Sequence, residues 1–139
     1  MVILDTNVLS ETLRPRPAEA VRAWLALQPT SEVFTTAVTE AEMRYGVAIM
    51  PAGRRREGLQ SALDSIFGEL LEERVLPFDA DAAKAYAAIA SLRRRAGNPI
   101  NQLDGQIAAI ARARAAVVAT RNVDDFSGCG VVLVNPWDG

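Results

Sequence analysis

Residues 2–8 read Val2-Ile3-Leu4-Asp5-Thr6-Asn7-Val8, an apolar run that stops at an aspartate where a helical pattern begins. Four more short apolar runs follow along the chain, and most of them are continuously apolar rather than alternating. Such runs are typical of strands covered on both faces, as in a parallel sheet between helices. The predicted strands are Val2–Leu4, Val33–Thr36, Val75–Phe78, Ala116–Thr120 and Val131–Val134.

Helical patterns separate these runs, and proline and glycine mark several of their ends. The order βααβααβααββ predicts an α/β fold, a three-layer sandwich with a central, mostly parallel sheet flanked by helices. With no internal repeat or linker, residues 1–139 are expected to form a single domain. The predicted helices are Thr6–Leu13, Ala18–Leu27, Thr39–Met50, Arg54–Glu73, Asp79–Ala96 and Leu103–Ala115.

The composition restricts the possible chemistry. The chain has 15 basic and 17 acidic residues, a net charge of −2, no histidine and a single cysteine, Cys129. An intramolecular disulfide, a Cys/His zinc site and Ser-His-Asp or Cys-His catalysis are therefore excluded, and any metal must be bound by oxygen. The lone thiol favours the cytoplasm, and neither a signal peptide nor a membrane-spanning stretch is expected.

Acidic residues follow the ends of the predicted strands, where ligands bind in open α/β sheets. Asp5 ends the first strand, Glu42 lies in the helix after the second, and Asp104 opens the sixth helix. Glu40 lies two residues before Glu42 and so points elsewhere. Carboxylates gathered at one edge repel one another unless a cation neutralises them, and hard oxygen ligands select Mg²⁺, with Mn²⁺ as a substitute.

Each of these acids also has a structural explanation. Asp5 would cap the next helix, residues 39–42 match a capping box in which Glu42 bonds the backbone, and Asp104 would be an N-cap or first-turn acid. Two other functions therefore stay open. One is a phosphotransfer protein with Asp5 as the acyl-phosphate acceptor, and the other is a non-catalytic partner-binding α/β module.

Further candidates come from the segment after the fourth strand and from the arginines, which make up 14 of the 15 basic residues. Thr6 and Thr120 are candidate hydroxyl donors that orient a water or a carboxylate. The arginine run 93–95 has a solvated helix face as its alternative explanation. The candidate substrate-binding residues are Arg44, Arg93, Arg94, Arg95, Arg112 and Arg121.

With these motifs in this order, the chain resembles PIN-domain ribonucleases, specifically the VapC toxin branch of bacterial toxin–antitoxin systems, FitB-like members included. The resemblance runs nearly end to end, and five motifs at matching spacings carry it. They are residues 2–8, residues 39–46 with Glu42, residues 104–109, Thr120-Arg121-Asn122 with Asp125-Phe126, and Val134-Asn135-Pro136-Trp137.

The resemblance implies a Mg²⁺-dependent endoribonuclease, usually a homodimer, that a cognate VapB-like antitoxin inhibits by occupying the active-site groove. Asp5, Glu42 and Asp104 match three acidic positions of the family's motif. Where many PIN domains carry a fourth aspartate this chain has Asn122, with Asp125 three residues later, and either is a candidate for that position. Hydrolysis by a metal-activated water would leave 5′-phosphate and 3′-hydroxyl ends on the RNA.

Overall fold

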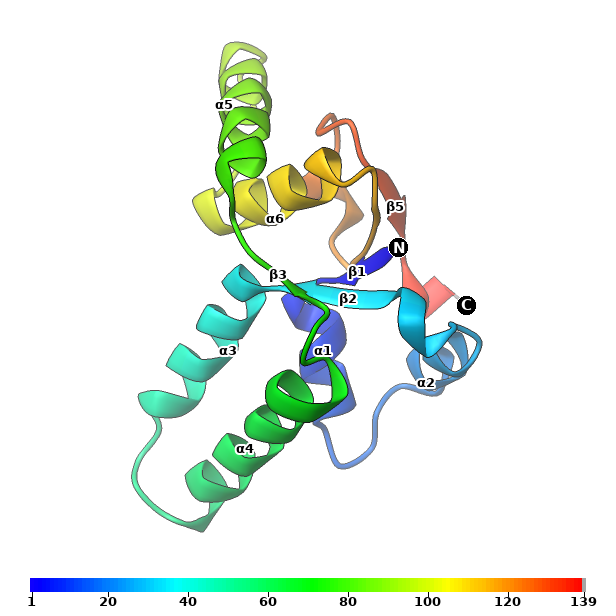
Figure 1. Cartoon of the computed structure of the whole chain (residues 1–139), viewed down its shortest axis with the longest axis vertical. Coiled ribbons are helices and arrows are strands. Elements are labelled where there is room, and N and C mark those ends of the chain that lie inside the picture. The colour runs from blue at the N-terminus through cyan, green and yellow to red at the C-terminus, as the bar shows by residue number, and fades with distance from the viewer. Residues whose placement is uncertain (139) are drawn as a thin grey trace.

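The computed structural model describes residues 1–138 and contains a central sheet with helices on both faces (Figure 1). The strands lie in the order β3-β2-β1-β4-β5, and every adjacent pair is parallel, which confirms the predicted sheet. The carboxyl ends of all these strands therefore lie at one edge. The strands are β1 (Val2–Leu4), β2 (Val33–Thr36), β3 (Val75–Leu76), β4 (Val117–Ala119) and β5 (Val132–Val134).

The helices alternate with the strands in the predicted order. Helices α5 and α6 cover one face of the sheet, and α1 to α4 lie toward the other (Figure 1). None of the helices within residues 1–138 is long and apolar enough to cross a membrane. The helices are α1 (Thr6–Thr12), α2 (Glu19–Ala26), α3 (Ala37–Ala48), α4 (Arg54–Ser65), α5 (Ala80–Arg95) and α6 (Gln102–Ala113).

Two apolar clusters fill the space between the sheet and its two helical layers. In β1, Ile3 packs against the α5 and α6 side, whereas Val2 and Leu4 pack on the opposite side. Successive strand residues point to opposite faces, so a strand buried on both faces must be apolar throughout. This packing explains why the β1 sequence does not alternate.

Most predicted boundaries lie within three residues of the observed ones, and at the ends of two elements the difference has a physical cause. Strand β3 ends at Leu76 rather than Phe78, because Pro77 has no backbone N–H to donate to a neighbouring strand. The predicted helix 54–73 is regular only as far as Ser65, and a π-helical turn over Ile66–Leu70 then ends it. The chain leaves the helix early because it must turn back toward the sheet edge at β3.

Helices α5 and α6 approach each other closely at Gly105. A Cβ atom at this position would lie 2.9 Å from Cε2 of Tyr86 and 3.2 Å from Cγ2 of Ile100. Both distances are shorter than ordinary van der Waals contact. The absence of a side chain thus lets the first turn of α6, which carries Asp104, settle against α5.

Replacing Gly105 by alanine is expected to lower the free energy of unfolding by about 1–3 kcal/mol, because the added methyl group overpacks the α5–α6 contact. Gly58 in α4 is a matched control, since a Cβ there would meet nothing within 4 Å. Gly58→Ala should stabilise the protein by about 0.5–1 kcal/mol through helix propensity alone. Urea denaturation measures both, and equal stabilisation by the two substitutions would contradict the close packing.

Candidate active site

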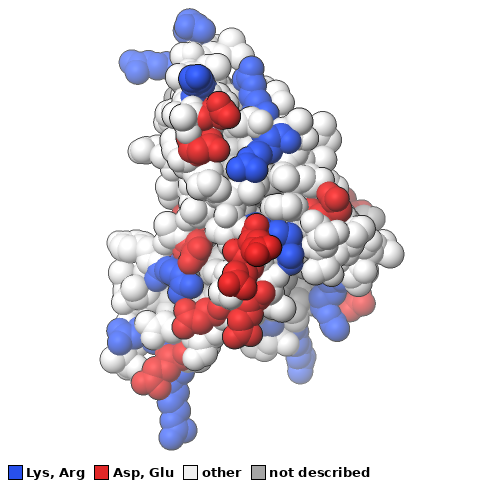
Figure 2. Space-filling view, viewed as in Figure 1, with Lys and Arg blue, Asp and Glu red and all other residues white. Residues whose placement is uncertain are grey.

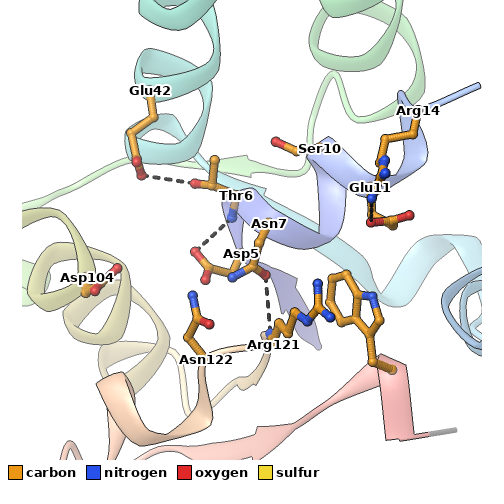
Figure 3. A pocket seen from close by; sticks show the side chains of 11 residues that line it. Asp5, Thr6, Asn7, Ser10, Glu11, Arg14, Glu42, Asp104, Arg121 and Asn122 are labelled. Carbon is orange, nitrogen blue, oxygen red and sulfur yellow. Dashed lines mark hydrogen bonds and ion pairs between the residues drawn. The ribbon is translucent and has the colours of Figure 1, made fainter. Parts of the chain in front are cut away.

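A pocket of about 530 Å³ opens at the carboxyl edge of the sheet. Its walls come from α1, α3, α6, the segment after β4 and the C-terminal turn, which are distant in the sequence (Figure 3). The parallel register of β1, β2 and β4 brings these segments together. The lining residues are Asp5, Thr6, Asn7, Ser10, Glu11, Arg14, Glu42, Asp104, Arg121, Asn122 and Trp137.

Asp5 lies at the centre of the pocket and is only 4% exposed. Its Oδ1 accepts a hydrogen bond from Thr6 N at 2.8 Å, and its Oδ2 accepts one from Thr120 Oγ1 at 2.9 Å. Burial raises the pKa of Asp5, the two hydrogen bonds lower it, and the nearby charge of Asp125 raises it further. Asp5 thus caps α1 and also presents a fixed carboxylate to the pocket.

Glu42 points into the pocket from α3, and its Oε1 accepts a hydrogen bond from Thr6 Oγ1 at 3.0 Å. The capping-box explanation is therefore wrong for this residue. Helix α3 begins at Ala37 rather than Thr39, because the Thr36 side chain is its N-cap. Burial raises the pKa of Glu42, the Thr6 hydrogen bond lowers it, and the charge of Asp5 raises it.

Asp104 faces Asp5 across the pocket from the first turn of α6 (Figure 3). The cap of α6 is Asn101, whose Oδ1 accepts hydrogen bonds from Leu103 N and Asp104 N. Within residues 1–138, no group donates a hydrogen bond to the Asp104 carboxylate. Burial and the negative charges of Asp5, Asp125 and Glu42 raise its pKa to about 6, while the charge of Arg93 acts in the opposite direction.

The donor set suits a hard cation, because every candidate ligand is an oxygen and the carboxylates repel one another. In the described part of the chain, however, no three acidic side chains stand close enough together to hold an ion directly. Mg²⁺ commonly keeps several of its waters and takes only one or two protein carboxylates. The residues therefore fit an ion that is bound partly through water.

The two candidates for the fourth position of the motif, Asn122 and Asp125, line different cavities. Asn122 lines the pocket, and its backbone N donates to Thr120 Oγ1 at 3.1 Å. Asp125 lines a neighbouring polar cavity that shares only Asp104 with the pocket. Asn122 therefore lines the same pocket as the three acids, while Asp125 acts on Asp5 and Asp104 through its charge.

The predicted arginines are dispersed. Arg121 lines the pocket, whereas Arg44 is ion-paired with Glu40 at 2.7 Å and with Asp64 at 2.9 Å. These pairs hold Arg44 on the side of α3 turned away from Glu42, with its guanidinium over the Phe67 ring. The two ion pairs raise the pKa of Arg44. Its role is to tie α3 to α4.

Arg93 is 7% exposed, so a solvated helix face does not describe it. Its Nε donates to the carbonyl of Asn98 at 2.8 Å, and its Nη1 donates to those of Asp125 and Ser127 at 2.9 and 3.0 Å. The guanidinium thus satisfies three backbone oxygens and ties the end of α5 to the turn after β4. These contacts account for the Arg93 side chain without a substrate, and the predicted substrate contact of Arg93 remains a prediction.

Arg94, Arg95 and Arg112 are exposed and lie outside the pocket. Figure 2 shows that charge is segregated on the face it displays, with acids gathered over β3 and the end of α4 and basic side chains lying mostly toward the two ends. A net charge near zero thus conceals local patches of both signs.

Several pocket residues were not among the predicted site residues. Four of them, Asn7, Ser10, Glu11 and Arg14, come from α1 and the residues just after it. Their spacing of three and four residues places them on one helix face, and this polar stripe could have indicated them. Trp137 lies within a motif of the resemblance, but nothing in its local sequence indicates that it reaches the pocket.

The chain matches the PIN domain family over residues 2–128. It is 42% identical to VapC ribonuclease Y4jK of Sinorhizobium fredii and 42% identical to Toxin FitB of Neisseria gonorrhoeae, and each match covers 99% of both chains. The crystal structure of FitAcB from Neisseria gonorrhoeae superimposes with a TM-score of 0.92 at 42% identity, again over 99% of both chains. These matches agree with the predicted family and fold.

Replacing Arg93 by methionine is expected to lower the free energy of unfolding by about 3 kcal/mol, because three partly buried backbone carbonyls lose a charged donor. Arg94 is the adjacent residue and is exposed, so Arg94→Met removes the same charge at a solvated position. This control should change the free energy of unfolding by less than about 0.5 kcal/mol. Urea denaturation compares them, and similar losses for both variants would rule out the tie between α5 and the turn after β4.

Asp104 is expected to destabilise the metal-free protein above pH 6. Its pKa is raised from 3.8 to about 6, so the folded state binds more protons than the unfolded state between these values. Asp104→Asn should therefore raise the Tm by a few degrees at pH 7.5, and the gain should shrink as the pH falls through 6 toward 4. Calorimetry in EDTA measures this, and a gain that is independent of pH would contradict it.

The same variant tests ion binding. Millimolar Mg²⁺ or Mn²⁺ should raise the Tm of the original protein and raise that of Asp104→Asn less, because a ligand stabilises the folded state to which it binds. Asp81→Asn on the exposed side of α5 is the matched control and should keep the full shift. NaCl at equal ionic strength separates binding from screening, and equal shifts for all three proteins would exclude Asp104 as a ligand.

Proposed function

The chain belongs to the PIN domain family, and we propose that it is a metal-dependent endoribonuclease whose Asp5, Glu42 and Asp104 bind Mg²⁺, in part through water. One observation carries this proposal. Three carboxylates that are far apart in the sequence line one pocket, and no basic side chain within residues 1–138 forms an ion pair with any of them. Their pKa values are raised, first by burial and then by neighbouring acidic charges, and a bound cation would offset both effects.

The bound ion would stabilise negative charge on the phosphoryl oxygens and lower the pKa of a water molecule. The protein's own residues prepare the site for it. Thr6 and Thr120 fix the carboxylates of Glu42 and Asp5 by donating hydrogen bonds, so their remaining lone pairs face the pocket. The chain has no histidine for the acid–base chemistry that 2′-hydroxyl attack commonly uses, so water is the nucleophile and the products carry 5′-phosphate ends.

Two structural observations disfavour the alternatives. A phosphotransfer role of the receiver type would place a lysine beside the phosphorylated aspartate, whereas no lysine lines the pocket and Lys84 lies on α5. A purely structural role for the acids would make each of them a helix cap. Glu42 instead bonds a side chain on another helix, and Asn101 is the cap of α6 in place of Asp104.

The relatives indicate the biological setting. One is named a ribonuclease and another a toxin, and both match this chain over 99% of its length. We assign this protein the toxin role in a toxin–antitoxin pair of the VapBC type, acting in the cytoplasm as a homodimer under the control of a VapB-like antitoxin. An apolar hollow beside exposed Tyr45 on α3 offers a surface for such contacts.

Cleavage of RNA by the purified protein should require Mg²⁺ or Mn²⁺ and stop on addition of EDTA. Asp5→Asn and Asp104→Asn should each reduce the rate by about a hundredfold or more, because each removes a ligand from an ion that contributes several kcal/mol. Asp81→Asn should cleave at the original rate. Labelling of product ends should detect 5′-phosphates, and metal-independent cleavage or 2′,3′-cyclic phosphate ends would refute the mechanism.

A further inference from the structure

Arg121 differs from the other basic residue of the pocket. Arg14 and Arg121 both line it, and Arg14 Nη1 donates to Glu11 Oε1 at 3.3 Å. Among the side chains of residues 1–138, none forms an ion pair with Arg121, and its guanidinium makes no hydrogen bond there. In a pocket lined by four carboxylates, its guanidinium donors therefore stay available to a ligand.

Trp137 holds this guanidinium in position. The Cζ atom of Arg121 lies over the Trp137 ring, 5.0 Å from the ring centroid, which is within the range of a cation–π contact. The indole packs against the apolar cluster below the sheet, and Trp137 N donates to Asn135 Oδ1 at 2.9 Å. The backbone N of Arg121 donates to Asn7 Oδ1 at 3.3 Å. Both ends of Arg121 are thus anchored.

Arg121 lies on the opposite side of Asp5 from Asp104 (Figure 3). Arg121 directly follows Thr120, whose hydroxyl bonds Asp5, so its place relative to the carboxylates is set by a short stretch of chain. A polyanion that enters this acidic pocket needs a cation at the rim. A guanidinium stacked by one face on an indole keeps its N–H edge free to bind two phosphate oxygens together.

We propose that Arg121, held on the face of Trp137, binds a phosphate group of the RNA strand next to the bond that is cleaved. Trp137 is a positioning residue that acts through Arg121 rather than on the RNA itself. This inference rests on the proposed function and deepens it by naming the side chain that binds the RNA backbone. It also identifies the wall of the pocket along which the RNA leaves the acidic centre.

Steady-state cleavage of an RNA oligonucleotide at several NaCl concentrations tests the role of Arg121. Arg121→Ala should raise KM about tenfold, which at 25 °C corresponds to about 1.4 kcal/mol, and leave kcat within about twofold. The slope of log(1/KM) against log[NaCl] should become shallower by about 0.7, the value for one phosphate contact on a single strand. Arg22→Ala, an exposed arginine of α2 outside the pocket, is the charge-matched control and should keep both values.

The role of Trp137 is tested in the same assay. Trp137→Leu should reproduce the rise in KM and the shallower slope, Trp137→Phe should restore both by supplying another aromatic face, and Arg121→Ala with Trp137→Leu should be no worse than Arg121→Ala alone. An unchanged KM and slope for Arg121→Ala would overturn the proposal, and additive effects in the double variant would overturn the positioning role. If the original protein cleaves no RNA, the proposed function fails instead.

Discussion

The hydrogen bonds around Asp5 are the constraint on which the site depends. Asp5 N donates to the carbonyl of Ala119 at 2.9 Å, and Thr120 Oγ1 donates to the Asp5 carboxylate at 2.9 Å. These bonds join the end of β1 to the end of β4, which lie more than one hundred residues apart in the chain. Because β1 and β4 are parallel, both chain segments leave the sheet at the same edge, and the pocket forms where they leave it.

The carboxylates of the site lower the stability of the folded protein when no cation is bound. Burial and mutual repulsion raise the pKa values of Asp5, Glu42 and Asp104, and within residues 1–138 no lysine or arginine forms an ion pair with them, although the charge of Arg93 lowers the pKa of Asp104. Hydrogen bonds from Thr6 and Thr120 offset part of this cost for two of the acids. Asp104 has no such donor within residues 1–138, and its pKa is raised to about 6. The pocket therefore keeps uncompensated negative charge at the place where a phosphodiester would bind, and a cation there would be stabilising.

The arginines show why residue type alone misleads. Arg93 and Arg94 are neighbours in a run of three, yet Arg93 is buried against three carbonyls while Arg94 is exposed. The helix turns by about 100° per residue, so adjacent residues face different environments. Arg44 lies two residues after Glu42, but its ion pairs with Glu40 and Asp64 turn it to another face of α3.

Much of this protein can be predicted from its sequence. The continuous apolar runs, the helix-breaking residues and the acids after strand ends are local features, and they indicate the parallel sheet, the element order and the three candidate acids. The partners of each side chain could not be predicted, because they come from segments distant in the sequence. Whether Glu42 caps its own helix or bonds Thr6, and whether Asn122 or Asp125 reaches the pocket, depends on how α3, α6 and the turn after β4 pack around β1. Trp137 beside Arg121 is the extreme case, since only tertiary packing brings the C-terminal turn to the rim.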